Sequence, residues 1–243
     1  MVLALLLIAT IAVAGVAAGY VVTLSQQREK LAEAKYAVSL LTEFSDAVQS
    51  IGFEGQKAAY VRYGFQYGGW QVADGGVSSV SLSLNGGSQT LLATQHALLE
   101  YVGGYSAYGT TRIYEARSQN LALVPAPSQS IVIYSYGGGG YTYSVADPRV
   151  YAAYSSSSGG SAQVSVYVFV FSAPVLQGPA RALMTLSGAI QHDSYSLNVF
   201  TPDPCVLNVA VGEVNGNLTV PVSLGGTVQV DVYTVTVTIS FSL

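Results

Sequence analysis

The N-terminal part of this chain joins a charge-free stretch to an amphipathic one, and nothing at the join would break a helix. Residues 1–25 contain no charged side chain, and residues 24–51 repeat apolar side chains at helical spacing. Together they predict one helix of about 50 residues, which would be about 75 Å long at 1.5 Å per residue. A bilayer core needs only about 20 of these residues, so the rest must project from a membrane or be buried against protein.

Three ordinary interpretations of the apolar stretch meet objections. A secretory signal peptide has a basic n-region, but the first basic residue is Arg28, even though Ala12-Val13-Ala14 offers a small-x-small cleavage site. A plain membrane anchor with its basic residues after the span would place the large domain in the cytoplasm. A core helix of a soluble protein rarely carries so long a charge-free run at a chain terminus. A basic leader cleaved from before Met1 would remove the charge conflict.

A bare apolar helix that continues as an amphipathic one resembles the N-terminal segment of archaeal type IV pilin-like subunits, which include adhesive pilins and archaellins. The resemblance covers Met1 to about Ile51 and is one of composition; the remainder agrees in architecture only. It implies a leader removed by a prepilin peptidase and mature helices that pack as a filament core. Bacterial pilins usually carry a Glu near the mature N-terminus, where this chain has leucines at 5–7. Archaeal relatives commonly lack that Glu, so this departure favours the archaeal branch.

Small residues within the apolar stretch favour contact between helices. Gly15 and Gly19 form a G-x-x-x-G motif surrounded by several alanines. Small residues four positions apart let helix backbones approach closely where no water drives association. We therefore expect Gly15 and Gly19 to lie at helix–helix contacts, although the motif also arises by chance in apolar segments.

The second half of the predicted helix has one apolar stripe and one polar side. The stripe requires a partner, and the nearest one is the remainder of the chain. Gly52 is expected to end the helix in the left-handed conformation. The residues predicted to pack between the helix and the β-rich part are Leu31, Val38, Leu41, Phe44 and Val48.

From Phe53 onward the composition changes to Ser, Thr, Tyr, Val and Gly, with few charges. Short runs such as Val80–Leu84 alternate apolar and polar residues, which is typical of strands, and Gly-rich turns separate them. Thr90–Val102 is the one segment here that reads as a second helix. In Val228–Leu243 the apolar residues change phase midway, which predicts a bulge or a strand that passes between sheets.

These patterns predict an α+β fold of the type IV pilin-like kind. Residues 1–52 would form the filament-core helix, apolar over 1–25 and amphipathic over 24–51. Residues 53–243 would form an all-β, sandwich-like outer domain.

The sequence carries little catalytic chemistry. His96 and Glu100 would share a face of the predicted second helix, but two ligands do not make a metal site. His192 and Cys205 would make a Cys/His pair only by chance, because no family signature surrounds them. We therefore predict no enzyme activity, no catalytic residue, no cofactor and no metal. A net charge of −4 gives no case for nucleic acid, and Asn217 heads the single N-glycosylation sequon.

The expected function is that of a structural subunit of an extracellular filament, an archaeal adhesive pilus built as a homopolymer through its N-terminal helices. The subunit would be membrane-inserted before assembly, and the filament could contact a surface or carbohydrate receptor. An archaellin of a motility filament is one alternative, and a membrane-anchored binding or hydrolytic ectodomain is another.

Overall fold

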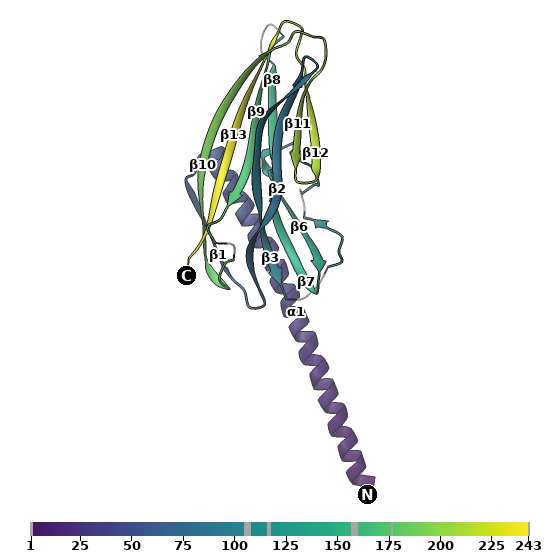
Figure 1. Ribbon diagram of the computed structural model, residues 1–243. Coiled ribbons are helices and arrows are strands. Elements are labelled where there is room, and N and C mark those ends of the chain that lie inside the picture. The colour runs from purple at the N-terminus through teal and green to yellow at the C-terminus, as the bar shows by residue number, and fades with distance from the viewer. Residues whose placement is uncertain (1, 105–107, 116–117, 157–159, 176, 243) are drawn as a thin grey trace.

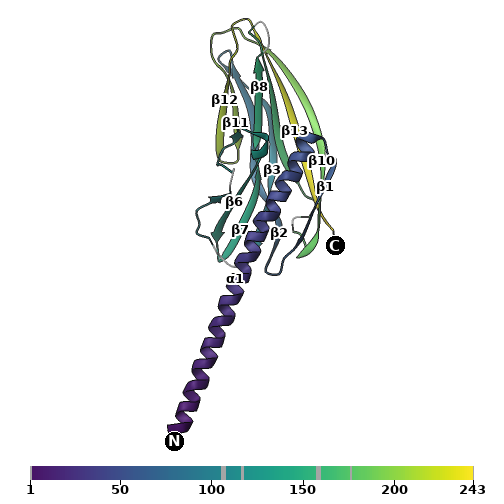
Figure 2. The same cartoon turned by 180° about the vertical axis from the view of Figure 1, so that it is seen from behind.

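The chain folds as one long helix followed by β-strands, as the computed structural model in Figure 1 shows. The structure describes residues 2–104, 108–115, 118–156, 160–175 and 177–242, with side chains from residue 10 onward; Met1 lies outside them. Helix α1 spans Val2–Glu54 and has 53 residues. Its N-terminal half extends away from the strands and its C-terminal half lies across them (Figures 1 and 2).

The strands form a six-stranded sheet, sheet A, and a seven-stranded sheet, sheet B, in the described part of the chain. Pairing is antiparallel except between β13 and β9 and between β5 and β8. In spatial order, sheet A contains β1 (Ala58–Gly64), β10 (Arg181–Asn198), β13 (Thr227–Ser242), β9 (Ala162–Ser172), β8 (Val150–Ser156) and β5 (Leu123–Val124). Sheet B contains β12 (Val214–Val220), β11 (Cys205–Val211), β2 (Gly68–Leu84), β3 (Gly87–Gly103), β7 (Tyr141–Pro148), β6 (Ile131–Gly138) and β4 (Ile113–Tyr114), and a 3₁₀ turn, η1 (Pro127–Gln129), precedes β6.

Two large apolar cores stabilise the described part of the fold, beside a smaller cluster around Val132, Tyr134 and Val145. The first, the sheet core, lies between the two sheets and includes Val80, Leu82, Val164, Val166, Leu207, Val209, Val228 and Val230. The second, the helix core, is formed where α1 covers the strands and includes Leu41, Phe44, Trp70, Tyr101, Phe169, Met184, Val235 and Ile239.

Strand β13 contributes to both cores by changing its buried face. Val228, Val230 and Val232 belong to the sheet core, whereas Val235 and Ile239 belong to the helix core. The pairing of β13 with β10 and β9 continues through this change without a register shift. The predicted bulge or change of sheet is therefore wrong. The phase changes because the two cores lie on opposite faces of one sheet.

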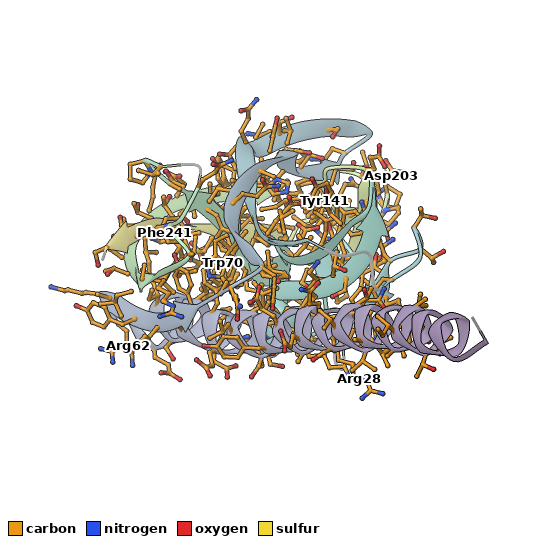
Figure 3. The ribbon with its side chains drawn as sticks, turned by 90° about the horizontal axis from the view of Figure 1, so that it is seen from below. Arg28, Arg62, Trp70, Tyr141, Asp203 and Phe241 are labelled. Atoms are coloured by element: carbon orange, nitrogen blue, oxygen red, sulfur yellow. The ribbon has the colours of Figure 1, made fainter. Side chains whose placement is uncertain are left out.

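The C-terminal half of α1 covers strands of both sheets, touching β1 and β10 of sheet A and β3, β6 and β7 of sheet B. Figure 3 shows α1 along one side of the β-strands, with Trp70 directed into the interior and Arg28 pointing away. The helix buries a continuous stripe that recurs at helical spacing. Its members are Ala34, Ala37, Leu40, Leu41, Phe44, Val48 and Ile51, each at most 2% exposed.

A carboxylate on α1 also fastens the loop between β1 and β2. Glu33 accepts hydrogen bonds from the hydroxyl of Tyr101 at 2.8 Å and from the backbone N–H of Tyr67 at 3.0 Å. One turn earlier on α1, Glu29 accepts a hydrogen bond from the hydroxyl of Tyr67 at 2.5 Å. These bonds hold α1 against sheet B where the helix leaves the β-strands.

The predicted end of the helix is wrong, because Gly52 lies inside α1 and is buried. Gly55, with φ of 73°, is the residue that leaves the helix in the left-handed conformation. A Cβ atom on Gly52 would lie 2.5 Å from Cε1 of Phe169. Glycine at position 52 therefore allows the helix to approach β9 closely.

The expected α+β, type IV pilin-like fold class is wrong. The chain is mostly β, with 57% of its residues in strands that form two curled sheets beside one helix. In the described part of the chain, no helix combines the length and the apolar character that a membrane crossing requires.

The predicted second helix, Thr90–Val102, is also wrong, because this segment lies in β3 and pairs with β2. A register shift between the two strands falls beside Leu91. The shift interrupts the apolar alternation along β3, so the leucines of this segment acquire a spacing that imitates a helix.

Gly52→Ala should destabilise the protein by about 1–3 kcal/mol, because the added methyl group must displace the Phe169 ring from a packed core. Helix propensity alone predicts the opposite sign, a gain of up to about 1 kcal/mol. Urea unfolding of both forms measures the difference. Gly19→Ala is the matched control, since nothing lies within 4 Å of its added Cβ. Equal stabilisation in both variants would contradict the close approach at Phe169.

Candidate functional site

Polar side chains gather where a β-bulge interrupts β2. The register between β2 and β3 shifts between Asp74 and Gly76, and φ of Gly76 is 88°. The Asp74 Oδ1 accepts a hydrogen bond from the Gly76 N–H at 2.8 Å, which fixes the bulge. A Cβ on Gly75 would lie 2.4 Å from His96 Nε2. The Asp-Gly-Gly sequence thus provides a positive φ and leaves room for an imidazole of β3.

A buried charge cluster lies beside this bulge. The Arg149 Nη1 lies 2.5 Å from Asp147 Oδ1, and His96 Nε2 lies 3.8 Å from the same oxygen. The His96 Nδ1 and the Ser78 hydroxyl share a hydrogen bond of 3.1 Å. None of these four residues is more than 6% exposed. Charged groups are therefore held in fixed positions away from water.

Burial dominates the electrostatics of the cluster. Desolvation lowers the pKa of His96, against the attraction of Asp147 and with the help of the Arg149 charge. Desolvation also raises the pKa of Asp147, and the charge and hydrogen bond of Arg149 oppose that rise. The lowered pKa favours the neutral imidazole of His96.

The cluster contains Ser, His and Asp but lacks the geometry of a nucleophilic site. At 3.8 Å, His96 Nε2 lies beyond hydrogen-bond distance of Asp147. Ser78 is 2% exposed and does not line the neighbouring cavity, so a substrate would not reach its hydroxyl there. Within the described residues, no group of three His, Cys, Asp or Glu side chains is placed to hold a metal ion.

The bulge borders a cavity of about 800 Å³, here called the bulge cavity. Its wall is contributed by β2, β3, β6, β7, the turn between β11 and β12, and the segment around β4. Figure 1 shows the β11–β12 hairpin beside β2, with β6 below it. The charged side chains that line the cavity are Asp74, Arg112, Asp147, Arg149 and Glu213.

The structure separates His192 from Cys205. Cys205 is buried in the sheet core, where desolvation raises the pKa of its thiol. His192 lies on β10 and pairs with Tyr233 of β13. Its side chain is on the face of sheet A that is turned away from the sheet core, and 48% of that side chain is exposed. Its Nε2 lies 3.2 Å from Asp231 Oδ1. The two residues cannot act together as a nucleophile and base.

Aromatic rings continue from His192 across sheet A in register. His192 stacks on Tyr233 at 4.6 Å, Tyr233 stacks on Tyr167 at 4.7 Å, and Tyr167 stacks on Tyr151 at 6.1 Å. Phe53, near the end of α1, packs against Tyr167 and Tyr151. This ladder connects four strands and the helix end, which is a packing role for part of the tyrosine content.

The two glycines predicted to lie at helix–helix contacts border open space in the single chain. Nothing lies within 4 Å of a Cβ built on Gly15 or Gly19. Of the residues predicted to face the β-rich part, Leu41, Phe44 and Val48 are buried in the helix core; Val38 packs at its edge and Leu31 is half-buried outside it. The predicted sequon residue, Asn217, is exposed on β12, an edge strand of sheet B.

Sequence reasoning missed the bulge cavity. Asp74-Gly75-Gly76 was the one local signal, because adjacent glycines inside an alternating run indicate a bulge. Nothing in the spacing of His96, Asp147 and Arg149 showed that long-range pairing of β2, β3 and β7 would bring them together. Glu100, considered with His96 as a ligand, is buried on β3 and accepts a hydrogen bond from Gln71 at 2.8 Å.

Comparisons of the chain with protein-family models, with curated proteins and with solved structures found no match.

His96 should make the stability of the protein fall with acidity. The lowered pKa means that the unfolded state binds a proton near pH 6.5 while the folded state does not. The free energy of unfolding should therefore fall as the pH drops below about 6.5, by up to about 1.4 kcal/mol per pH unit. His96→Gln should reduce this slope between pH 7 and pH 5 in denaturant titrations. An unchanged slope in the variant would contradict the burial of a neutral imidazole.

Asp147→Asn should cost about 3–5 kcal/mol, because it leaves the buried Arg149 charge without its ion pair. Chemical denaturation at pH 7 measures the loss. Glu213→Gln is the matched control, since this carboxylate borders the same cavity but is exposed, and its effect should stay within about 0.5 kcal/mol. The double variant Asp147→Leu/Arg149→Met should recover much of the loss. Equal effects of Asp147→Asn and Glu213→Gln would rule out a structural ion pair.

Proposed function

We propose that this chain is a structural subunit of an extracellular filament, an adhesive pilus of the archaeal type IV class, assembled through the N-terminal half of α1. The observation that carries the proposal is the projecting apolar helix. Ile11, Val13 and Val16 are 64%, 70% and 76% exposed, and every residue from Thr10 to Thr23 is exposed.

A helix that is apolar on every side requires burial on every side. In the part of the chain that the structure describes, residues 10–23 are exposed and no strand covers them, so in the proposed filament their cover comes from another molecule. A second copy of the same segment supplies a matching apolar surface, and repetition of that contact along an axis generates a filament. The free space around Gly15 and Gly19 fits the close approach of such a neighbour.

The β-strands support a division of labour within the subunit. The sheet core and the helix core are completed by residues 34–242, without any contribution from the projecting segment. Assembly and folding are thus assigned to different parts of the chain. In the proposed filament, the strands form the outer layer and carry any glycan at Asn217.

Gly15→Leu and Gly19→Leu should prevent or strongly reduce filament formation, because each isobutyl group occupies the space that a neighbouring helix would use. Electron microscopy and sedimentation measure assembly, and thermal unfolding of the β-strands should be unchanged. Gly15→Ala and Gly19→Ala, which add only a methyl group, are the matched controls and should assemble far better.

Normal filaments from both leucine variants would remove the helix contact from the proposal. If the wild-type chain forms no filaments and its apolar segment is found only in lipid or detergent, the anchored-ectodomain alternative takes its place.

A further inference from the structure

We propose that the bulge cavity binds a saccharide, a neutral ligand rich in hydroxyl groups. The proposal goes beyond assembly of a filament, because the cavity belongs to the strands of one subunit and does not involve the projecting half of α1. Its volume of about 800 Å³ lies within the range of natural small-molecule sites, about 300–1,000 Å³.

The cavity contains a buried polar group whose hydrogen-bonding capacity is incompletely used. Arg149 lines the cavity and is 2% exposed. Its Nη1 is paired with Asp147 and donates to the Pro148 carbonyl at 3.3 Å. Its Nε has no hydrogen-bond partner among the described residues. The Nε atom is itself buried, and the ion pair holds the guanidinium group that lines the cavity in one orientation. Little side-chain freedom is therefore lost when a ligand binds beside it.

The charges of the wall select against ionic ligands. Arg112 and Arg149 oppose the carboxylates Asp74, Asp147 and Glu213. An anion would meet three carboxylates, and a cation would meet two guanidinium groups. A hydroxyl group both donates and accepts, so it can give a hydrogen bond to a carboxylate and take one from an arginine. The mixed wall therefore suits a neutral ligand with several hydroxyls.

Part of the wall is apolar. Val77 is 49% exposed, and Leu98, Val211 and Val214 line the same cavity. The Gly212 N–H donates a hydrogen bond to the Val77 carbonyl at 3.0 Å, which holds the turn between β11 and β12 against β2. A pyranose ring has a C–H face and a rim of hydroxyls. The C–H face can pack against these apolar residues, and the hydroxyls can form hydrogen bonds with the charged groups.

The test titrates the full-length chain with neutral sugars while following binding by calorimetry and by NMR. The probes are glucose, galactose, mannose, N-acetylglucosamine and their disaccharides, each to tens of millimolar, with inorganic phosphate and glucuronate as anionic comparisons. Val77→Phe adds a ring at an exposed position of the cavity lining. Asp74→Asn keeps an oxygen for the Gly76 N–H but removes the charge. Ile190→Phe, at a position 48% exposed on β10 and outside the cavity, is the matched control.

We expect at least one neutral sugar to bind, and binding to weaken by about tenfold or more in Val77→Phe while Ile190→Phe binds as the wild type does. Asp74→Asn should weaken binding as well, which gives a second measurement if Val77→Phe folds poorly. No binding by any neutral sugar, or binding of phosphate and glucuronate alone, would overturn the proposal. Filament formation is measured separately by electron microscopy. A failure of sugar binding can therefore be distinguished from a failure of filament assembly.

Discussion

The cover that α1 provides for the helix core is the contact on which the rest of the structure depends. Strands β9 and β13 each bury apolar residues on both faces of sheet A. In the first half of each strand these residues face the sheet core, and in the second half they face the helix core. The first half is covered by sheet B, but the second half needs another layer. Helix α1 supplies it with side chains such as Leu41 and Phe44, each contributing on the order of 1.5–3 kcal/mol by burial. Without this helix, Val235, Val237 and Ile239 would lose their cover.

The same helix links this core to the exposed apolar segment without an interruption. Hydrogen bonds of Glu29 and Glu33 to Tyr67 and Tyr101 fix α1 at the point where it leaves the strands. The direction of the projecting half is therefore set by the fold rather than by a linker. In the proposed filament, a contact between projecting halves would position the outer strands as well, because no hinge separates the two parts of α1.

The periodicity of apolar residues predicts those elements whose structure is decided by neighbouring residues in the chain. It located the helix and most of its buried stripe, and alternation located the strands near Val80 and Val164. It failed where tertiary contacts decide. The apolar spacing of Thr90–Val102 predicts a helix because a register shift beside Leu91 disturbs the alternation of this strand. Gly52 is predicted to end the helix because its close approach to Phe169 is not visible in the sequence. The bulge cavity could not be predicted, since His96 and Arg149 meet only through the pairing of strands far apart in the chain.

The charge cluster at the bulge cavity is difficult to explain by stability alone. Burying Arg149 and Asp147 incurs a desolvation cost that their mutual attraction only partly offsets, and apolar residues of similar volume often stabilise a fold equally well or better. Asp74-Gly75-Gly76 likewise interrupts β2 where an unbroken strand would pair more regularly. Local departures of this kind are expected at functional sites, where a fold gives up some regularity to present particular groups. Two such departures meet at one cavity, and one leaves a buried guanidinium nitrogen without a partner among the described residues. Recognition of a polar ligand gives a single physical reason for both.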